Sequence, residues 1–256
     1  MAELSGTGLA VLVASAFAFP LVFLAWIRNT ERFGREPWRA VLKTFTWGAV
    51  ISVIVAIVLS LLLLGAFEEI GPVYEFLSRR FGDPETAVAV VAALVVAPLA
   101  EEAAKAVSVR TGRRHSETIV DGLVYGAAAG LGFSATENLF YGVAYLAQLG
   151  ASGSILLIVF RSFSSSLLHA SATAVTGYGM AKGWHTMRRW AFLPFYFVAV
   201  LMHATFNFLS TFGVLYSAQV GEAAYLIGFA ATLVFAVTAV TIVRFKLARQ
   251  RSPAGR

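Results

Sequence analysis

The sequence contains no cysteine, so disulfide bonds, thiolate metal sites and a cysteine nucleophile are all excluded. Aspartate is nearly absent as well, because Asp83 and Asp121 are the two in the chain. Asp83 lies in a predicted loop and Asp121 near a predicted membrane boundary, which excludes a catalytic pair of aspartates inside a membrane. There is also no HExxH pattern, the two-histidine helix with which many zinc proteases bind their metal.

Charge is scarce along the 256 residues. Charged residues make up 13% of the chain and apolar residues 58%, whereas soluble proteins average about a quarter charged. The net charge of +6 comes from basic residues that are divided among the gaps between apolar runs and do not form one basic face or arm. This distribution is typical of membrane topology, so we expect a lipid bilayer and no nucleic acid as partner.

Long apolar runs fill most of the chain. A helix needs about 20 apolar residues to cross a hydrocarbon core about 30 Å thick, and backbone in lipid must be helical to satisfy its polar groups. Seven segments meet this length: 6–27, 41–66, 86–109, 120–146, 154–181, 190–212 and 222–243. The predicted fold is therefore an all-α, polytopic transmembrane bundle that forms a single domain over residues 1–256.

The basic residues predict the orientation of these spans. Fifteen of the 20 Lys and Arg lie in alternate connections and in the basic tail 244–256, whereas the opposite connections hold only Arg79 and Arg80. Basic loops remain in the cytoplasm, so we expect the N-terminus outside and the tail inside. Residues 1–6 lack the positive start of a signal peptide, which predicts that the first span is retained.

Ionisable residues also lie deep inside the predicted spans, where a charge costs about 3 kcal/mol or more. They are Glu101, Glu102, Lys105, Glu137, Arg161, His169 and His203. Lys105 lies three and four residues after the two glutamates, so it can neutralise either on one helix face. At 1.5 Å per residue, four of these groups lie at a similar depth of about 12–25 Å below the outer membrane boundary; they are Glu102, Glu137, His169 and His203. We therefore expect a polar cavity in which these residues face one another.

This set of side chains suggests hydrolytic chemistry. A glutamate beside a lysine can take a proton from water. Together, Glu102, Glu137, His169 and His203 can form an oxygen and nitrogen site for a divalent metal such as zinc, with one position left for water. Asn207, one turn after His203, is an amide donor suited to an oxyanion.

Each feature also has a structural explanation. Glu101, Glu102 and Lys105 can form a buried ion pair, and the histidines can be core residues bonded to neighbouring helices. Arg161 is expected to be a counter-charge, and Asp121 can cap the helix that follows it. The glycines of the fourth span allow close helix packing; they are Gly122, Gly126, Gly130 and Gly132.

Between residues 90 and 210 the motifs match a known pattern. Glu101 to Lys105 fits EExxK, and His169 is followed by His203-xxx-Asn207. A middle block runs from Asp121-Gly122 through Gly132-Phe133 to Glu137-Asn138. The chain resembles the PrsW family of bacterial intramembrane proteases and, more distantly, the CAAX-type prenyl endopeptidases.

This resemblance implies an endopeptidase of a bacterial or archaeal cell membrane that cleaves membrane-anchored proteins, such as an anti-sigma factor. It implies Glu101 and Glu102 as water-activating acids, with Glu137, His169 and His203 completing the site. The catalytic core is expected within residues 90–210. In the distant CAAX-type superfamily a histidine stands at the position of Glu137, so the prenyl-protein mechanism does not transfer directly.

Three other functions remain open at this stage. Gly150 to Gly153 spells the GxSG of rhomboid serine proteases, and a serine run near His169 offers further hydroxyls; its members are Ser162, Ser164, Ser165 and Ser166. A proton-coupled transporter would use the buried Glu and His as relay groups, with Pro98 breaking the third span. A membrane scaffold would keep the cavity without catalysis. We predict the intramembrane endopeptidase, with Lys105 or Asn207 stabilising the oxyanion.

Overall fold

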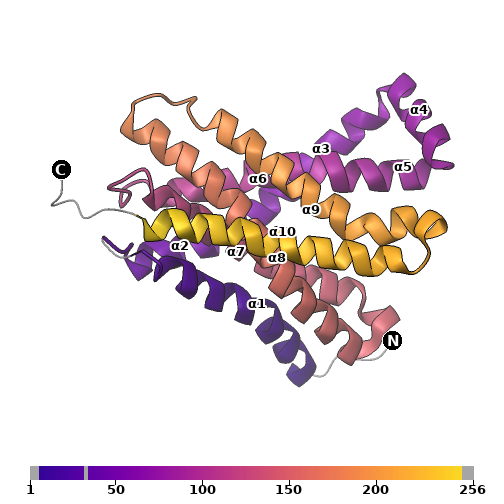
Figure 1. The fold of residues 1–256 in the computed structure, drawn as a ribbon, viewed down its shortest axis with the longest axis horizontal. Helices are drawn as coiled ribbons and strands as arrows, with labels where there is room; N and C mark the ends of the chain where they lie inside the picture. Colours follow the sequence, from indigo (N-terminus) through magenta and orange to yellow (C-terminus); the bar gives the residue numbers. More distant parts are fainter. Residues whose placement is uncertain (1–5, 32–33, 250–256) are drawn as a thin grey trace.

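The computed structural model describes residues 6–31 and 34–249, all of whose regular elements are helical (Figure 1). Short π-helical turns interrupt the second and third apolar segments, and a 3₁₀ turn follows the third. In chain order the elements are α1 (Gly6–Arg28), α2 (Trp38–Trp47), η1 (Gly48–Ser52), α3 (Val53–Glu68), α4 (Gly71–Phe81), α5 (Pro84–Val91), η2 (Ala92–Val96), α6 (Ala97–Val109), η3 (Arg110–Gly112), α7 (Asp121–Ala144), α8 (Leu146–His185), α9 (Leu193–Val220) and α10 (Ala223–Ala248).

Six helical segments in the described part of the chain are long and apolar enough to cross a membrane. They are Gly6–Arg28, Trp38–Glu68, Pro84–Gly112, Leu146–His185, Leu193–Val220 and Ala223–Ala248. The predicted all-α membrane bundle is therefore confirmed. The remaining predicted span corresponds to α7, whose 24 residues extend about 36 Å but which is not among these six segments. The count of seven and the orientation stay predictions, and Arg32 and tail residues 250–256 lie outside the described residues.

One predicted loop contains more structure than expected, and another forms the predicted turn. The outer connection 67–85 forms α4 and the start of α5, which project together at one end of the bundle (Figure 1). Asp83 begins α5 as its N-cap, since its carboxylate accepts a hydrogen bond from the Thr86 N–H at 2.8 Å. Gly150 turns the chain at a positive φ of 67° between α7 and the long part of α8, as the predicted turn requires.

The central helix α7 is buried because its small residues let the neighbouring backbones approach it. A Cβ atom on Gly126 or Gly130 would overlap main-chain atoms of Thr173 or His169 in α8. On the opposite side, Gly132 lies directly against the carbonyl of Phe45 in α2. The predicted packing role of these glycines is thus observed, and it places Glu137 of α7 beside His169 of α8.

Asp121 does not act as the N-cap of α7, contrary to expectation. It is the first residue of the helix, and its carboxylate accepts hydrogen bonds of 2.7 Å from the N–H groups of Glu117 and Thr118. An N-cap accepts hydrogen bonds from the first turn of its helix, but Glu117 and Thr118 precede α7. Asp121 therefore stabilises the turn before the helix.

Two buried glutamates lie in the connection between α1 and α2, outside the spans. Glu31 accepts a hydrogen bond from the main-chain N–H of Glu36, and the Tyr125 hydroxyl donates to the Glu36 carboxylate. Burial and, to a smaller extent, the nearby charge of Asp121 raise the pKa of Glu31 to about 7 and that of Glu36 to about 8. The sequence analysis did not single out this cluster.

These raised pKa values predict a pH-dependent stability. A carboxyl group whose pKa is higher in the folded state stabilises the fold below its unfolded pKa of about 4.5, and this contribution is lost as pH rises through about 8. We expect Glu36→Gln, which cannot ionise, to narrow the difference in melting temperature between about pH 5 and about pH 9 by several degrees. Thermal unfolding of the purified protein at both pH values measures this. The exposed Glu69→Gln variant is the control, and an unchanged pH dependence in Glu36→Gln would contradict the prediction.

Candidate active site

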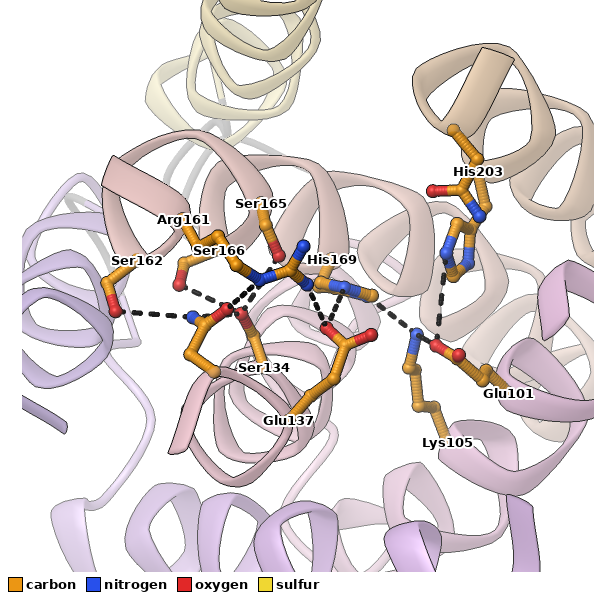
Figure 2. A network of polar contacts seen from close by, with 12 residues as sticks. Glu101, Lys105, Ser134, Glu137, Arg161, Ser162, Ser165, Ser166, His169 and His203 are labelled. Carbon is orange, nitrogen blue, oxygen red and sulfur yellow. Dashed lines mark hydrogen bonds and ion pairs between the residues drawn. The ribbon is translucent and has the colours of Figure 1, made fainter. Parts of the chain in front are cut away.

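The predicted ionisable residues of four helices meet in one network (Figure 2). Its centre is the ammonium of Lys105 on α6, which is fully buried. This ammonium lies 3.2 Å from a carboxylate oxygen of Glu101, 2.9 Å from one of Glu102 and 2.7 Å from Nδ1 of His169 on α8. The EExxK spacing thus brings both carboxylates to one lysine, as the sequence predicts.

Glu102 is enclosed on every side. Its second oxygen accepts a 2.9 Å hydrogen bond from the hydroxyl of Thr173, and its first lies 3.2 Å from Nδ1 of His203 on α9. The side chain of Glu102 has no exposed surface. The sequence analysis missed Thr173, although it lies one helical turn after His169 and therefore on the same face of α8.

Glu137 on α7 completes the network from the opposite side. One of its oxygens lies 3.1 Å from Nε2 of His169 and 3.2 Å from the guanidinium of Arg161. Arg161 is fixed in turn by the side-chain oxygen of Asn138 at 3.2 Å and by the ring of Tyr141, 3.5 Å below its guanidinium. Arg161 is therefore a counter-charge that orients Glu137, as predicted.

Two of the three glutamates open onto a groove. This groove, of about 260 Å³, lies between α3 and α7 and is lined on one side by Val53, Ala56, Ile57, Ser60 and Leu61. On the other side its lining includes Glu101 and Glu137. The side chain of Glu101 is 12% exposed and that of Glu137 is 20% exposed, so a molecule in the groove can reach both carboxylates but not Glu102.

Asn207 of α9 bonds the main chain just before α6. In the π-helical turn η2 the Ala97 N–H bonds the Ala92 carbonyl, five residues back. The next donor in this pattern would be Pro98, which has no N–H, so the carbonyl of Ala93 loses its main-chain partner. The side-chain amide of Asn207 donates to that carbonyl at 2.7 Å. Asn207 therefore bonds the backbone before Glu101, a contact that does not support its predicted role at the oxyanion.

This contact predicts that the stability lost in Asn207→Ala depends on whether residue 98 is proline. Asn207→Ala leaves the Ala93 carbonyl without a donor inside the membrane, which should lower the free energy of unfolding by about 1–3 kcal/mol. Pro98→Ala supplies an N–H for the same carbonyl, so Asn207→Ala should cost less in that background. Chemical or thermal unfolding of the four variants in one detergent measures the coupling. Equal costs in both backgrounds would show that the amide does not serve this carbonyl.

Three possible metal ligands lie close together in the network. Among the described residues, Glu101, His169 and His203 place one carboxylate oxygen and two ring nitrogens within 4.8 Å of one another. One carboxylate and two imidazoles leave a fourth position for water, which is the donor set of many catalytic zinc sites. The predicted set contained Glu102 and Glu137 in place of Glu101, but Glu102 has no exposed surface and Glu137 is paired with Arg161. The chemistry of the donor set fits a divalent metal.

The serine candidates do not form a nucleophile near the imidazoles. Ser162, Ser165 and Ser166 take part in hydroxyl and amide contacts with Ser134 and Asn138. Ser164 bonds the carbonyl of Phe160, one turn earlier. Ser152 of the GxSG sequence is exposed, just after the Gly150 turn. The hydroxyls of the serine run 162–166 therefore stabilise helix packing or bond the preceding turn.

A buried set of carboxylates and imidazoles lies inside a bundle of apolar helices and beside a groove, which is the arrangement that a membrane-embedded hydrolase requires. The sequence matches the family described as PrsW family intramembrane metalloprotease over residues 36–242, and the chain belongs to this family. It is 27% identical over 197 residues to Protease PrsW of Clostridioides difficile (strain 630), with 74% of each chain covered. No solved structure matches the chain.

Family membership identifies the chain as an intramembrane protease and a multi-pass membrane protein. The family match extends beyond the motif region 90–210 in both directions, so it includes α2, α3 and most of α10. A proton-coupled transporter is not favoured, because the matched family and the relative are both proteases.

Proposed function

We propose that the chain hydrolyses peptide bonds of membrane-anchored proteins within a bacterial or archaeal cytoplasmic membrane. An anti-sigma factor or a similar regulator is the kind of substrate that we expect. The observation that carries this proposal is the groove between α3 and α7, where apolar side chains line one wall and two carboxylates the other. An apolar, extended segment of a substrate can lie along α3 with its backbone against Glu101.

Glu101 is the proposed water-activating group, because its carboxylate faces the groove whereas Glu102 is enclosed. It takes a proton from water, and the resulting hydroxide attacks the peptide carbonyl carbon. The positive charge of Lys105, which lies behind Glu101 at 3.2 Å from its carboxylate, stabilises the oxyanion of the tetrahedral intermediate without direct contact. The C–N bond then breaks as the proton passes from Glu101 to the leaving amine, which yields a carboxylate and an amine.

The other residues of the network orient these groups. Thr173 holds Glu102, and Glu102 in turn holds Lys105 and His203, through contacts of 2.9–3.2 Å. Glu137 is the second carboxylate on the groove, and Arg161 and His169 hold it. In this proposal Asn207 is a positioning residue that fixes α6 through Ala93.

A divalent metal, if bound, would be held by Glu101, His169 and His203 and would lower the pKa of a bound water. Glu137 would then be the groove carboxylate that is left to accept a proton. We expect about one zinc per chain after purification, a loss of most of this metal in His203→Ala, and full occupancy in the control His185→Ala, whose side chain is exposed. Elemental analysis of each purified protein measures the metal directly. Metal-free protein that retains its activity in chelator would remove the metal from the proposal and leave the glutamate mechanism.

The proposed function is tested by comparing fragments of membrane proteins in the native host. Cells that produce the wild type should contain new protein termini near membrane boundaries that are missing with the Glu101→Gln/Glu102→Gln double variant. Mass spectrometry of both membrane fractions identifies the termini and thereby the substrates. Identical fragment maps at rest and under stress, with both proteins folded, would overturn the protease assignment and make a proton-flux assay in liposomes the next test.

A further inference from the structure

A second cavity lies at the other end of the catalytic helix. It has a volume of about 750 Å³ and is bounded by the end of α6, the end of α8 and the start of α9. Its wall is largely apolar and aromatic, with Val107, Met180, Trp184, Trp190 and Leu193 among the lining residues. This volume lies in the range of pockets that hold small organic ligands. The mechanism proposed above does not use it.

Three arginines give this apolar cavity a positive charge. Arg110 and Arg113 lie in and just after η3, and Arg189 lies in the turn between α8 and α9. No acidic residue lines the cavity, and none of the three arginines has a carboxylate partner among residues 6–31 and 34–249. A planar guanidinium matches the oxygens of a phosphate, so the unpaired charge favours an anionic ligand.

The turn that closes α8 brings an exposed apolar side chain to the cavity. The Arg188 N–H bonds the Gly183 carbonyl at 3.1 Å, which places Met187 at the left-handed position that usually holds glycine after a helix. Met187 has a φ of 56°, is 88% exposed and lines the cavity. Trp190, also in the lining, is 62% exposed. Exposed apolar and aromatic side chains beside arginines are typical of the membrane interface.

From this geometry we propose that the cavity binds an anionic phospholipid. Its phosphate lies among Arg110, Arg113 and Arg189, and an acyl chain follows the apolar wall between α6 and α9. Basic pockets between the ends of membrane helices bind anionic headgroups in this way. An acidic peptide fits less well, because most of the lining side chains are apolar and cannot hydrogen-bond a peptide backbone.

The ligand would pack against the back of the catalytic helix. Ala103 and Ala106 of α6 line the cavity and alternate along the helix with Glu102 and Lys105 of the active site. Tyr196 also lines it, and its hydroxyl donates to the Leu99 carbonyl of the same helix at 2.9 Å. A bound lipid therefore stabilises α6 and the folded bundle, so its binding can be measured as thermal stability independently of proteolysis.

The test uses the full chain, purified in neutral phosphatidylcholine nanodiscs. Phosphatidylglycerol is titrated in, and the melting temperature and the lipids retained in native mass spectrometry are recorded. We expect a saturable rise in melting temperature of several degrees with one retained anionic lipid per chain. The Arg110→Gln/Arg113→Gln/Arg189→Gln variant should bind phosphatidylglycerol about 100-fold more weakly, because each of the three basic side chains contributes roughly fivefold.

Two further variants keep the result interpretable. Arg79→Gln/Arg80→Gln removes two basic residues of α4 and should respond like the wild type. Ala106→Phe fills the cavity without changing charge and should weaken binding even if the triple variant fails to fold. An equal phosphatidylglycerol response in wild type, Ala106→Phe and any folded triple variant would overturn the proposal. So would stabilisation of the wild type by an acidic peptide in phosphatidylcholine where phosphatidylglycerol has no effect.

Discussion

Glu101→Gln is expected to lower the rate of peptide hydrolysis by about 10²- to 10⁴-fold while the protein stays folded. Glutamine has nearly the same shape but cannot take a proton from water. Glu101 is partly exposed on the groove, and its one close hydrogen bond is to Lys105, which Glu102 and His169 also contact. The fold therefore depends little on its charge. Cleavage of a substrate found by fragment mapping, followed on gels in proteoliposomes, measures the rate, and thermal unfolding measures the stability.

Glu102→Gln is the informative comparison. Glu102 is enclosed and bonds Lys105, Thr173 and His203, so the loss of its charge leaves a buried ammonium undercompensated. We expect Glu102→Gln to lower the free energy of unfolding by about 3 kcal/mol as well as the activity. Glu68→Gln, an exposed change at the end of α3, is the control for both measurements. Full activity in Glu101→Gln, or activity lost only through unfolding, would assign water activation to another group.

The bundle itself could be predicted because its causes are local in the sequence. Each apolar run satisfies its own backbone as a helix, and its length matches a bilayer, so 6–27 and 222–243 are close to α1 and α10. The helical hairpin within 67–85 was missed because its residues are mixed in polarity and resemble a loop. The glycines of α7 indicated close packing, but they did not predict its central position. That position depends on the partners of these glycines in α2 and α8.

The buried polar network was predicted in most of its members and less well in its pairings, while the catalytic roles stay predictions. The cost of burying a charge implies that Glu101, Lys105, Glu137 and His169 must face partners, and they do. Which carboxylate lies beside which imidazole depends on the rotation of each helix about its axis, and the sequence does not give this rotation. In the structure Glu101, and not Glu102, forms the group of possible metal ligands with the two histidines. The link from Asn207 to Ala93 could not be foreseen, because it follows from a π-helical turn that puts Pro98 opposite that carbonyl.

Gly130→Ala is expected to disrupt both the packing of the bundle and the active site. Gly130 lies at the contact of α7 and α8, where an added Cβ would overlap the main-chain carbonyl of His169. Backbone cannot move aside as a side chain can, so the helices must separate, at a cost of about 3 kcal/mol or more. Because His169 belongs to the clashing turn, its contacts with Lys105 and Glu137 should be lost together with the stability.

The matched change is Gly65→Ala in α3, where nothing lies within 4 Å of the added methyl group. Alanine has the higher helix propensity, so this variant should be as stable as the wild type or slightly more stable. Thermal unfolding and cleavage assays on both variants separate the effect of helix propensity on stability from the effect of the lost close packing. If Gly130→Ala unfolds and cleaves like Gly65→Ala, then α7 and α8 do not pack this closely. The positions of Glu137 and His169 would then need another support, since the active site depends on the same contact that the glycines make possible.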